Sequence, residues 1–344
     1  MAGRGRSGRA GCAGWDGRAR PRHPLSGSAG QPAPATRTPQ ASSVTATSVL
    51  APCRTPTKET AITALSEVLA QVDAWEPPTV AVGVTDAAAT RAIHGPTDQV
   101  LPFTSVTKPL TAYAVLLAVQ HGAVHLDEPL GEHAPVPEAT VRHLLAHAGG
   151  LPPQPGGAPL QPVGRRRVYS DWGFELLGGL IADRVGLPFD EHLRLDVLEP
   201  LGMDSTKLTG SPGHAAQGSV DDLLAFAREL LAPRLLDAEL HAAATSPAFP
   251  ELDGVVPGFG RQSPCPWGLG PEIKGDKAPH WTGSRLHATT FGHFGQSGSF
   301  LWVDPTRGVA AAELADRDFD TWAQQAWPAF NDAVVAAVDA AVDA

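Results

Sequence analysis

The chain has 344 residues, of which 42% are hydrophobic and 18% are charged, a globular composition that excludes disorder throughout. At roughly 100–200 residues per domain, it can form two domains or one domain with a large insertion. The net charge is −10, and an acidic body argues against nucleic acid as the main partner.

The first 58 residues differ from the rest of the chain. They are rich in Gly, Arg, Pro, Ser and Thr, and they carry nine basic residues against one acidic residue, Asp16. Such a segment buries too little apolar surface to offset the entropy that ordering removes. We predict that residues 1–58 form a disordered basic extension, or that the start codon has been placed too early.

No segment is typical of a membrane span or a disulfide framework. The longest apolar run, Ala112–Val119, is far shorter than the roughly 20 residues that a span needs. The basic start leads into no apolar stretch of the kind that a signal peptide contains. The three cysteines are too few and too scattered for disulfides or a thiolate metal site. We expect no transmembrane segment and a cytoplasmic protein by default, with export and oligomeric state left open.

The first folded elements are predicted from apolar periodicity. Apolar residues recur at helical spacing over residues 59–72 and predict an amphipathic helix. The β-rich run Thr79–Thr85 and a shorter run that ends at Ile93 predict a hairpin. A strongly apolar helix is then predicted from about Thr104 to His121.

The remainder divides into a helical stretch and a series of strands. Residues of about 123–254 are predicted to be mostly helical, with the clearest helices at Asp171–Val185 and Ser219–Leu231. Strands are predicted at Trp267–Ile273, Leu286–Phe291, Ser299–Val303 and Val309–Ala315, and a closing helix at Trp322–Val342. This order predicts an α+β domain over residues 59–344. Its antiparallel sheet with flanking helices comes from residues 59–122 and about 255–344, and residues 123–254 form a mostly helical insertion.

The sequence Ser105-Val106-Thr107-Lys108 opens the long apolar helix. Side chains three positions apart lie on one face of a helix, so the Ser105 hydroxyl and the Lys108 amine can meet. A neighbouring lysine is a known way to activate a hydroxyl, and a helix N-terminus stabilises a developing oxyanion. The chain has 21 Arg but only five Lys, and lysine, unlike arginine, can lose its proton and become a base. Taken alone, the pattern also fits a surface lysine.

Two further segments carry groups that could transfer protons. Tyr169, one of only two tyrosines, directly precedes the predicted helix at Asp171–Val185; a structural tyrosine is the alternative. His293 lies in the glycine-rich segment 291–299, where a ligand could approach the backbone closely. Its imidazole could bind a carboxylate or assist proton transfer, although an ordinary histidine in a hairpin fits as well.

Taken together and in this order, these elements resemble the three motifs of the serine β-lactamase and penicillin-binding protein family, in particular its class C β-lactamase-like branch. The segments Leu126–Leu130, Val141–Pro152 and Pro200–Thr206 are also similar to that family. The resemblance covers the chain from about Glu59 onward. It implies a β-lactamase/transpeptidase-like fold and a serine hydrolase that acts on a β-lactam, a D-peptide or a simple ester.

The resemblance also implies roles for the site residues. Ser105 would be the nucleophile that forms an acyl-enzyme, and Lys108 would ease its deprotonation. Tyr169 would act as general base and then as acid to the leaving group. The backbone N–H groups of Ser105 and Gln296 would form an oxyanion hole, with Gly295 assigned to the same region. No metal or cofactor is implied, and the partner is a small-molecule or peptide substrate.

Two residues depart from the common family pattern. Asp171 stands where the family usually has Asn, and His293 stands where many relatives have Lys, a variant of esterase-like and peptidase-like members. An ionised aspartate only accepts hydrogen bonds, whereas an asparagine also donates them. We expect Asp171 to pair with Lys108, to favour Tyr169 over Lys108 as the base, and to disfavour β-lactams and peptides relative to esters.

Three other interpretations were compared with this one. Residues 295–299 lack the final glycine of the Gly-x-Ser-x-Gly elbow of α/β-hydrolases. The pairs His143/His147 and His121/His125 lack the glutamate of the His-Glu-x-x-His zinc motif. A catalytically silent member of the same fold that binds peptidoglycan or a peptide stays open, and reactivity with an acylating probe would separate it from an enzyme.

Overall fold

The computed structural model describes residues 58–342, so the predicted extension lies outside the described residues except for Lys58. This part of the chain is organised around a six-stranded antiparallel sheet in the order β2-β1-β11-β10-β9-β8. The strands are β1 (Val80–Asp86), β2 (Thr90–His94), β8 (Glu272–Ile273), β9 (Phe291–Gly295), β10 (Ser299–Asp304) and β11 (Val309–Ala315). The predicted α+β fold with an antiparallel sheet is confirmed.

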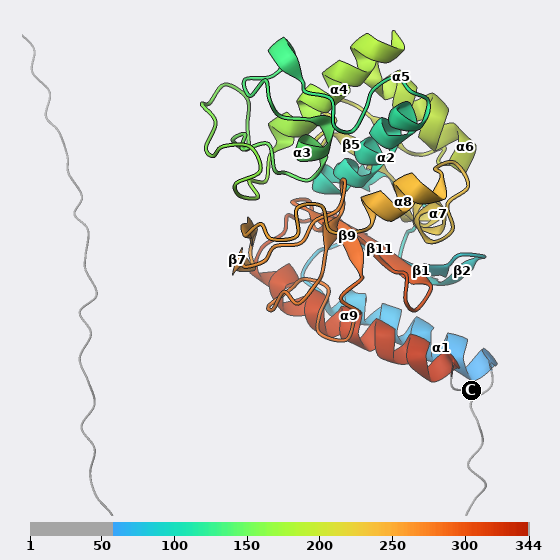
Figure 1. Cartoon of the computed structure of the whole chain (residues 1–344). Coiled ribbons are helices and arrows are strands. Elements are labelled where there is room, and N and C mark those ends of the chain that lie inside the picture. The colour runs from blue at the N-terminus through green and yellow to red at the C-terminus, as the bar shows by residue number, and fades with distance from the viewer. Residues whose placement is uncertain (1–57, 343–344) are drawn as a thin grey trace, which may run out of the picture. The chain divides into compact units, whose positions relative to one another are not determined.

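Helices cover both faces of the sheet (Figure 1). On one face, α1 (Lys58–Leu69) and α9 (Thr321–Val342) lie side by side. On the other face lie α2 (Thr107–Gln120), α4 (Asp171–Val185) and α7 (Val220–Leu231). Because both faces are buried, the central strands are almost continuously apolar rather than alternating.

Alternation along each strand assigns its side chains to two cores. In β10, Phe300 and Trp302 pack toward α1 and α9, in the lower core, while Leu301 and Val303 belong to the upper core under the helical part. The strands β1, β9, β10 and β11 therefore contribute to both cores, because successive side chains point to opposite faces. The lower core is strongly aromatic and includes Trp281, Trp322, Trp327, Phe294 and Phe330.

The predicted helices at Asp171–Val185 and Ser219–Leu231 are confirmed by their caps. The Ser170 hydroxyl accepts a hydrogen bond from Gly173 N, and Gly186 ends α4 in the left-handed conformation at φ 76°. Ser219 caps α7 by accepting from Asp222 N. A side-chain acceptor at the start and a glycine at the end satisfy backbone groups that a helix leaves free.

Between α2 and the last strands, short elements build the helical part. Its helices are η3 (Gly131–His133), α3 (Val141–Leu145), α5 (Phe189–Leu193), η4 (Arg194–Leu198), α6 (Glu199–Leu201) and α8 (Ala238–Ala244). Its strands are β4 (Lys207–Leu208) and β5 (Ala216–Gly218), which form a small sheet with β3 (Leu101–Pro102), followed by the hairpin of β6 (Gly254–Val256) and β7 (Gly260–Gln262). The further short helices η1 (Ala70–Ala74) and η2 (Thr104–Val106) follow α1 and precede α2.

Two predicted strands were wrong in extent. Of Trp267–Ile273, only Glu272 and Ile273 form β8, because the chain turns where Gly268 N donates to Pro271 O. Gly270 has a φ of +114°, which an extended strand does not allow. Of Leu286–Phe291, only Phe291 belongs to a strand, and that strand continues to Gly295 and so contains the third motif.

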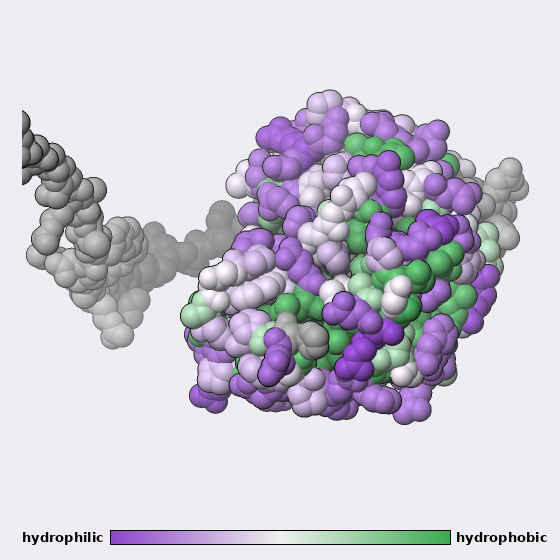
Figure 2. All heavy atoms as spheres, turned by 90° about the horizontal axis from the view of Figure 1, so that it is seen from above, coloured by the Kyte–Doolittle hydropathy of each residue, from purple (hydrophilic) through white to green (hydrophobic). Residues whose placement is uncertain are grey.

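The surface seen from the side of the helical part is mainly polar, with small areas of hydrophobic residues between the polar ones (Figure 2). The large apolar side chains that are exposed come from separate segments of the chain: Ile93, Val100, Leu160, Leu187, Leu195 and Val255. Within residues 58–342, no helix has the length and apolar character required to cross a bilayer.

Candidate active site

The three motifs meet where the start of α2 faces the end of β9, between the sheet and the helical part (Figure 1). Ser105 lies in η2, directly before α2, and is partly exposed. The Tyr169 hydroxyl donates a hydrogen bond of 2.7 Å to Ser105 Oγ, and Lys108 Nζ lies 3.4 Å from the same oxygen. One hydroxyl is thus in hydrogen-bond contact with two groups that can exchange protons.

Lys108 is completely buried and its ammonium is fully hydrogen-bonded. Besides Ser105, its Nζ donates to Asp171 Oδ1 at 2.5 Å and to Gly213 O at 2.8 Å. Three acceptors match the three protons of an ammonium. Burial lowers the pKa of Lys108 to about 8, although the Asp171 carboxylate acts in the opposite direction. At neutral pH a small fraction of Lys108 is therefore already a free amine.

Tyr169 and His293 are both held in their neutral forms. Burial raises the pKa of Tyr169 well above its usual value. Burial, and then the positive charge of Lys108, lower the pKa of His293 to about 4. The Nδ1 atom of His293 lies 2.7 Å from the carbonyl oxygen of Phe294, which can only accept, so Nδ1 carries the proton. The Nε2 atom, 3.4 Å from the Tyr169 hydroxyl, is then an acceptor.

Several residues that support Tyr169 were missed by the sequence analysis. His147 Nδ1 accepts from Ser170 N, and the His147 ring packs 4.5 Å from the Tyr169 ring. Trp267 contacts the rings of Tyr169 and His293. Arg167 is buried and donates to the carbonyl oxygens of Ala146, Ala248, Phe249 and Cys265. His147 was named only within the segment Val141–Pro152 and as half of a rejected zinc pair, and no local signal distinguished Trp267 or Arg167.

The histidine pairs considered for zinc have other contacts. His143 Nδ1 accepts from Thr140 N in the cap of α3, and its ring stacks on Phe249 at 4.7 Å. His147 supports Tyr169 as described above. Across residues 58–342, no group of three or more His, Cys, Asp or Glu side chains is arranged to hold a metal ion.

The residue before Ser105 has a strained backbone that hydrogen bonds stabilise. Thr104 has a φ of +43°, a region that a β-branched residue rarely adopts. Its Oγ1 accepts from Ser297 N at 3.1 Å and also lies 3.1 Å from Ser297 Oγ. A Cβ on Gly295 would lie 2.2 Å from Thr104 Oγ1, so this close approach of β9 to η2 requires glycine. Thr104, Gly295 and Ser297 together fix the nucleophile against the third motif.

This contact predicts a loss of stability in Thr104→Val. The variant keeps the branched shape but leaves the N–H of Ser297 without its acceptor, which is expected to lower the free energy of unfolding by about 1–3 kcal/mol. Urea unfolding followed by circular dichroism measures this. Thr289→Val is the matched control, because the Thr289 hydroxyl is exposed and contacts only Thr306 Oγ1. An equal effect in both variants would contradict the role assigned to Thr104.

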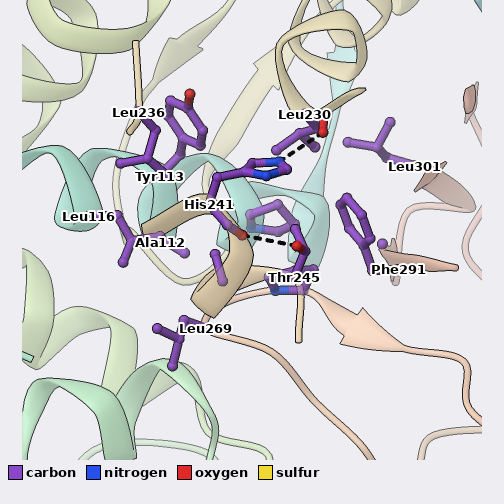
Figure 3. Close-up of a pocket in the computed structure, with 14 residues that line it drawn as sticks. Ala112, Tyr113, Leu116, Leu230, Leu236, His241, Thr245, Leu269, Phe291 and Leu301 are labelled. Atoms are coloured by element: carbon purple, nitrogen blue, oxygen red, sulfur yellow. Dashed lines mark hydrogen bonds between the residues drawn. The ribbon is translucent and has the colours of Figure 1, made fainter. Parts of the chain in front are cut away.

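A narrow apolar cavity lies elsewhere in the upper core (Figure 3). It is enclosed by residues of α2, α8, β9 and β10, among them Ala112, Leu116, Thr245, Phe291 and Leu301. The His241 ring hydrogen-bonds Leu230 O at its wall. None of Ser105, Lys108, Tyr169 or His293 lines it, so this cavity belongs to the packing of the core and not to the catalytic cluster.

Comparisons with known proteins agree with the fold and identify the family. Residues 72–335 match the model of the β-lactamase family, so the chain belongs to this family, whose members are serine hydrolases. A β-lactamase from Mycobacterium bovis of known structure is 46% identical, with a TM-score of 0.76, over 79% of this chain and 99% of that chain.

Other relatives have different activities. The D-alanyl-D-alanine-carboxypeptidase/endopeptidase AmpH of Escherichia coli is 30% identical over 147 residues, which are 33% of this chain and 38% of that protein. The chain therefore spans well under half the length of this curated relative. EstCE1, a hydrolase with promiscuous acyltransferase activity, shares the fold at 16% identity, with a TM-score of 0.68 over 80% of this chain and 99% of that chain.

Proposed function

We propose that the protein is a serine hydrolase that cleaves an ester or amide through an acyl-enzyme on Ser105. The observation that carries the proposal is the position of Ser105 Oγ, which is in hydrogen-bond contact with both Tyr169 and Lys108. In the first step Ser105 Oγ attacks the substrate carbonyl carbon. The N–H groups of Ser105 and Gln296 receive the negative charge that develops on the carbonyl oxygen.

The pKa directions favour Lys108 as the acceptor of the Ser105 proton. The Lys108 pKa of about 8 allows a neutral amine near physiological pH, whereas the raised pKa of Tyr169 keeps its hydroxyl protonated. Tyr169 then donates its proton to the leaving group, and the proton taken by Lys108 restores it. Water finally attacks the acyl-enzyme, which releases the acid and regenerates Ser105. The sequence-based expectation had given the role of base to Tyr169.

This division of roles predicts the pH dependence of acylation. The rate is expected to rise about tenfold per pH unit below pH 8 and to level off above it, because only the neutral Lys108 amine accepts the proton. Asp171 raises the pKa of Lys108, so Asp171→Asn should move the midpoint to lower pH. Stopped-flow acylation by a p-nitrophenyl ester measures both profiles. A midpoint well above pH 10 would instead identify Tyr169 as the base.

The proposal is tested by intact mass spectrometry after mixing the protein with penicillins, cephalosporins and short p-nitrophenyl esters. An adduct or turnover that is lost in Ser105→Ala supports the acyl-enzyme. Ser284→Ala is a control, because the exposed Ser284 hydroxyl donates to Asp332 Oδ2 and contacts none of the catalytic groups, so the variant should leave adduct formation in place. Absence of any adduct, together with retained binding of peptidoglycan fragments, would favour the catalytically silent alternative.

A further inference from the structure

Two buried lysines in the described part of the chain, Lys108 beside Ser105 and Lys277 after β8, have no free N–H group for an anionic substrate. Lys108, the cation nearest to the nucleophile, has all three protons bound by Ser105, Asp171 and Gly213. Lys277, which follows β8, is also buried and donates to Glu272 Oε1, Pro266 O and Ile273 O. Both ammonium groups are thus satisfied by the protein itself.

The third motif offers no side-chain cation or hydroxyl either. His293 is neutral and its one N–H group is bound to Phe294 O. Phe294 packs in the lower core against Phe319 and Trp327. Where β9 turns into β10, the hydroxyls of Ser297 and Ser299 donate to the backbone oxygens of Pro102 and Phe103.

A carboxylate, in contrast, reaches the surface beside the nucleophile. The Asp171 side chain is 17% exposed, and each of its oxygens has a single partner, Lys108 Nζ on Oδ1 and Gln154 Nε2 on Oδ2. A carboxylate has about four acceptor positions, so two remain for a ligand. An anionic group placed here would be repelled by Asp171 and would find no free proton on Lys108, whereas an ammonium would find an acceptor.

We infer that the substrate is an ester or amide whose acyl part carries a free amino group, held by Asp171, and no carboxylate near the scissile carbonyl. This inference rests on the proposed function and adds the charge of the substrate to it. The expected order of preference is a substrate with an ammonium beside the scissile carbonyl first, one with an uncharged group second and one with a carboxylate last. A substrate that presents a carboxylate beside the reacting carbonyl is excluded by charge rather than by shape.

Three phenyl esters of nearly equal shape test the inference. Esters of alanine, 2-methylpropanoic acid and methylmalonic acid place an ammonium, a methyl or a carboxylate beside the same carbonyl. At about pH 6.5 the amino group is ionised. Relative to its uncatalysed hydrolysis rate, the alanine ester is expected to have a kcat/KM about tenfold above that of the 2-methylpropanoic ester. The methylmalonic ester is expected to lie about tenfold below it, because two unit charges a few ångströms apart at a partly exposed site interact appreciably. Phenol release by Ser105→Ala gives the background.

Asp171→Asn removes both the proposed binding of the substrate ammonium and the effect of Asp171 on the pKa of Lys108. The effect on Lys108 changes the rates of all three esters alike, so only the ratios between the esters report on ammonium binding. Although absolute rates will change, the kcat/KM ratios between the three esters in Asp171→Asn should approach the ratios of their uncatalysed hydrolysis rates. Glu175→Gln is the matched control: it removes a carboxylate one turn further along α4, whose Oε1 accepts from Ser211, and should preserve the wild-type ratios. If the wild-type kcat/KM values, each divided by the uncatalysed hydrolysis rate, were equal for the three esters or highest for the methylmalonic ester, the inference would be overturned. The acyl-enzyme proposal would still stand. No phenol release above the Ser105→Ala background would overturn the proposed function itself.

Discussion

Tyr169→Phe is expected to lower kcat/KM for ester hydrolysis by about 10²–10⁴-fold, the usual contribution of a positioned proton donor or acceptor. The substitution removes only the hydroxyl that contacts Ser105 Oγ at 2.7 Å and leaves the ring between His147 and Trp267. Steady-state kinetics with p-nitrophenyl esters measures the loss. The free energy of unfolding should change by less than about 1 kcal/mol, because the lost hydroxyl is at the edge of the cluster.

The chain contains one other tyrosine, which provides a matched control. The Tyr113 hydroxyl donates to Glu229 Oε1 at 2.7 Å inside the upper core and touches none of the catalytic groups. Tyr113→Phe should therefore lower stability by about 1–2 kcal/mol and leave kcat/KM within about twofold of the wild type. If Tyr169→Phe lost only stability, or if both variants lost activity equally, the proton-transfer role of Tyr169 would be refuted.

Lys277→Met is expected to lower the free energy of unfolding by about 3–5 kcal/mol, the largest stability effect of any substitution discussed. The Lys277 ammonium and the Glu272 carboxylate are both buried and lie 2.6 Å apart. Removing Lys277 leaves the buried Glu272 carboxylate with only His280 and Trp281 as hydrogen-bond partners, and loss of one member of a buried ion pair is strongly destabilising. Denaturation in guanidinium chloride measures the change. Lys274→Met, at a half-buried lysine three residues earlier, is the control and should stay within about 0.5 kcal/mol.

The pH dependence of the same variant tests the physical cause. Burial alone would raise the pKa of Glu272, but Lys277 and His280 together outweigh it through charge and hydrogen bonds and hold that pKa well below its usual value. A lowered pKa contributes stability above the unfolded pKa of about 4.3, and this stability is lost as the pH falls. In Lys277→Met the pKa of Glu272 in the folded protein should instead be raised. The folded state then binds the proton more tightly than the unfolded state, so the free energy of unfolding falls as the pH rises. The difference in free energy of unfolding between wild type and Lys277→Met should therefore widen from pH 4 to pH 7. A difference that stays constant over this range would mean that lost packing, and not charge, causes the destabilisation.

The sequence predicted the elements that local chemistry defines. The helix Asp171–Val185 has a serine cap before it and a glycine after it, and the strand Val309–Ala315 is an apolar run between turns that only Glu313 interrupts. The predicted strand Trp267–Ile273 failed because turns at its glycines outweighed its apolar pattern.

The site was predictable only where its residues occur in motifs. Ser105, Lys108 and Tyr169 could be named from their spacing and order. The partners Gly213, whose carbonyl oxygen accepts from Lys108, and Gln154, whose amide donates to Asp171, could not, since each lies in a loop with no distinctive sequence. The left-handed backbone of Thr104 was equally hidden, because it depends on Ser297, nearly two hundred residues away.

The strand order also has a consequence for synthesis. β1 lies between β2 and β11, with Val80 opposite Ala315, so a strand made early pairs along one edge with the last strand of the sheet. While the ribosome is still translating the intervening residues, the chain can form the β1–β2 hairpin but not the centre of the sheet. Pairings between such distant segments form slowly and leave unpaired edges open to aggregation meanwhile. A nascent chain that stalls before residue 315 therefore lacks the middle of its sheet, although most of its residues have been made.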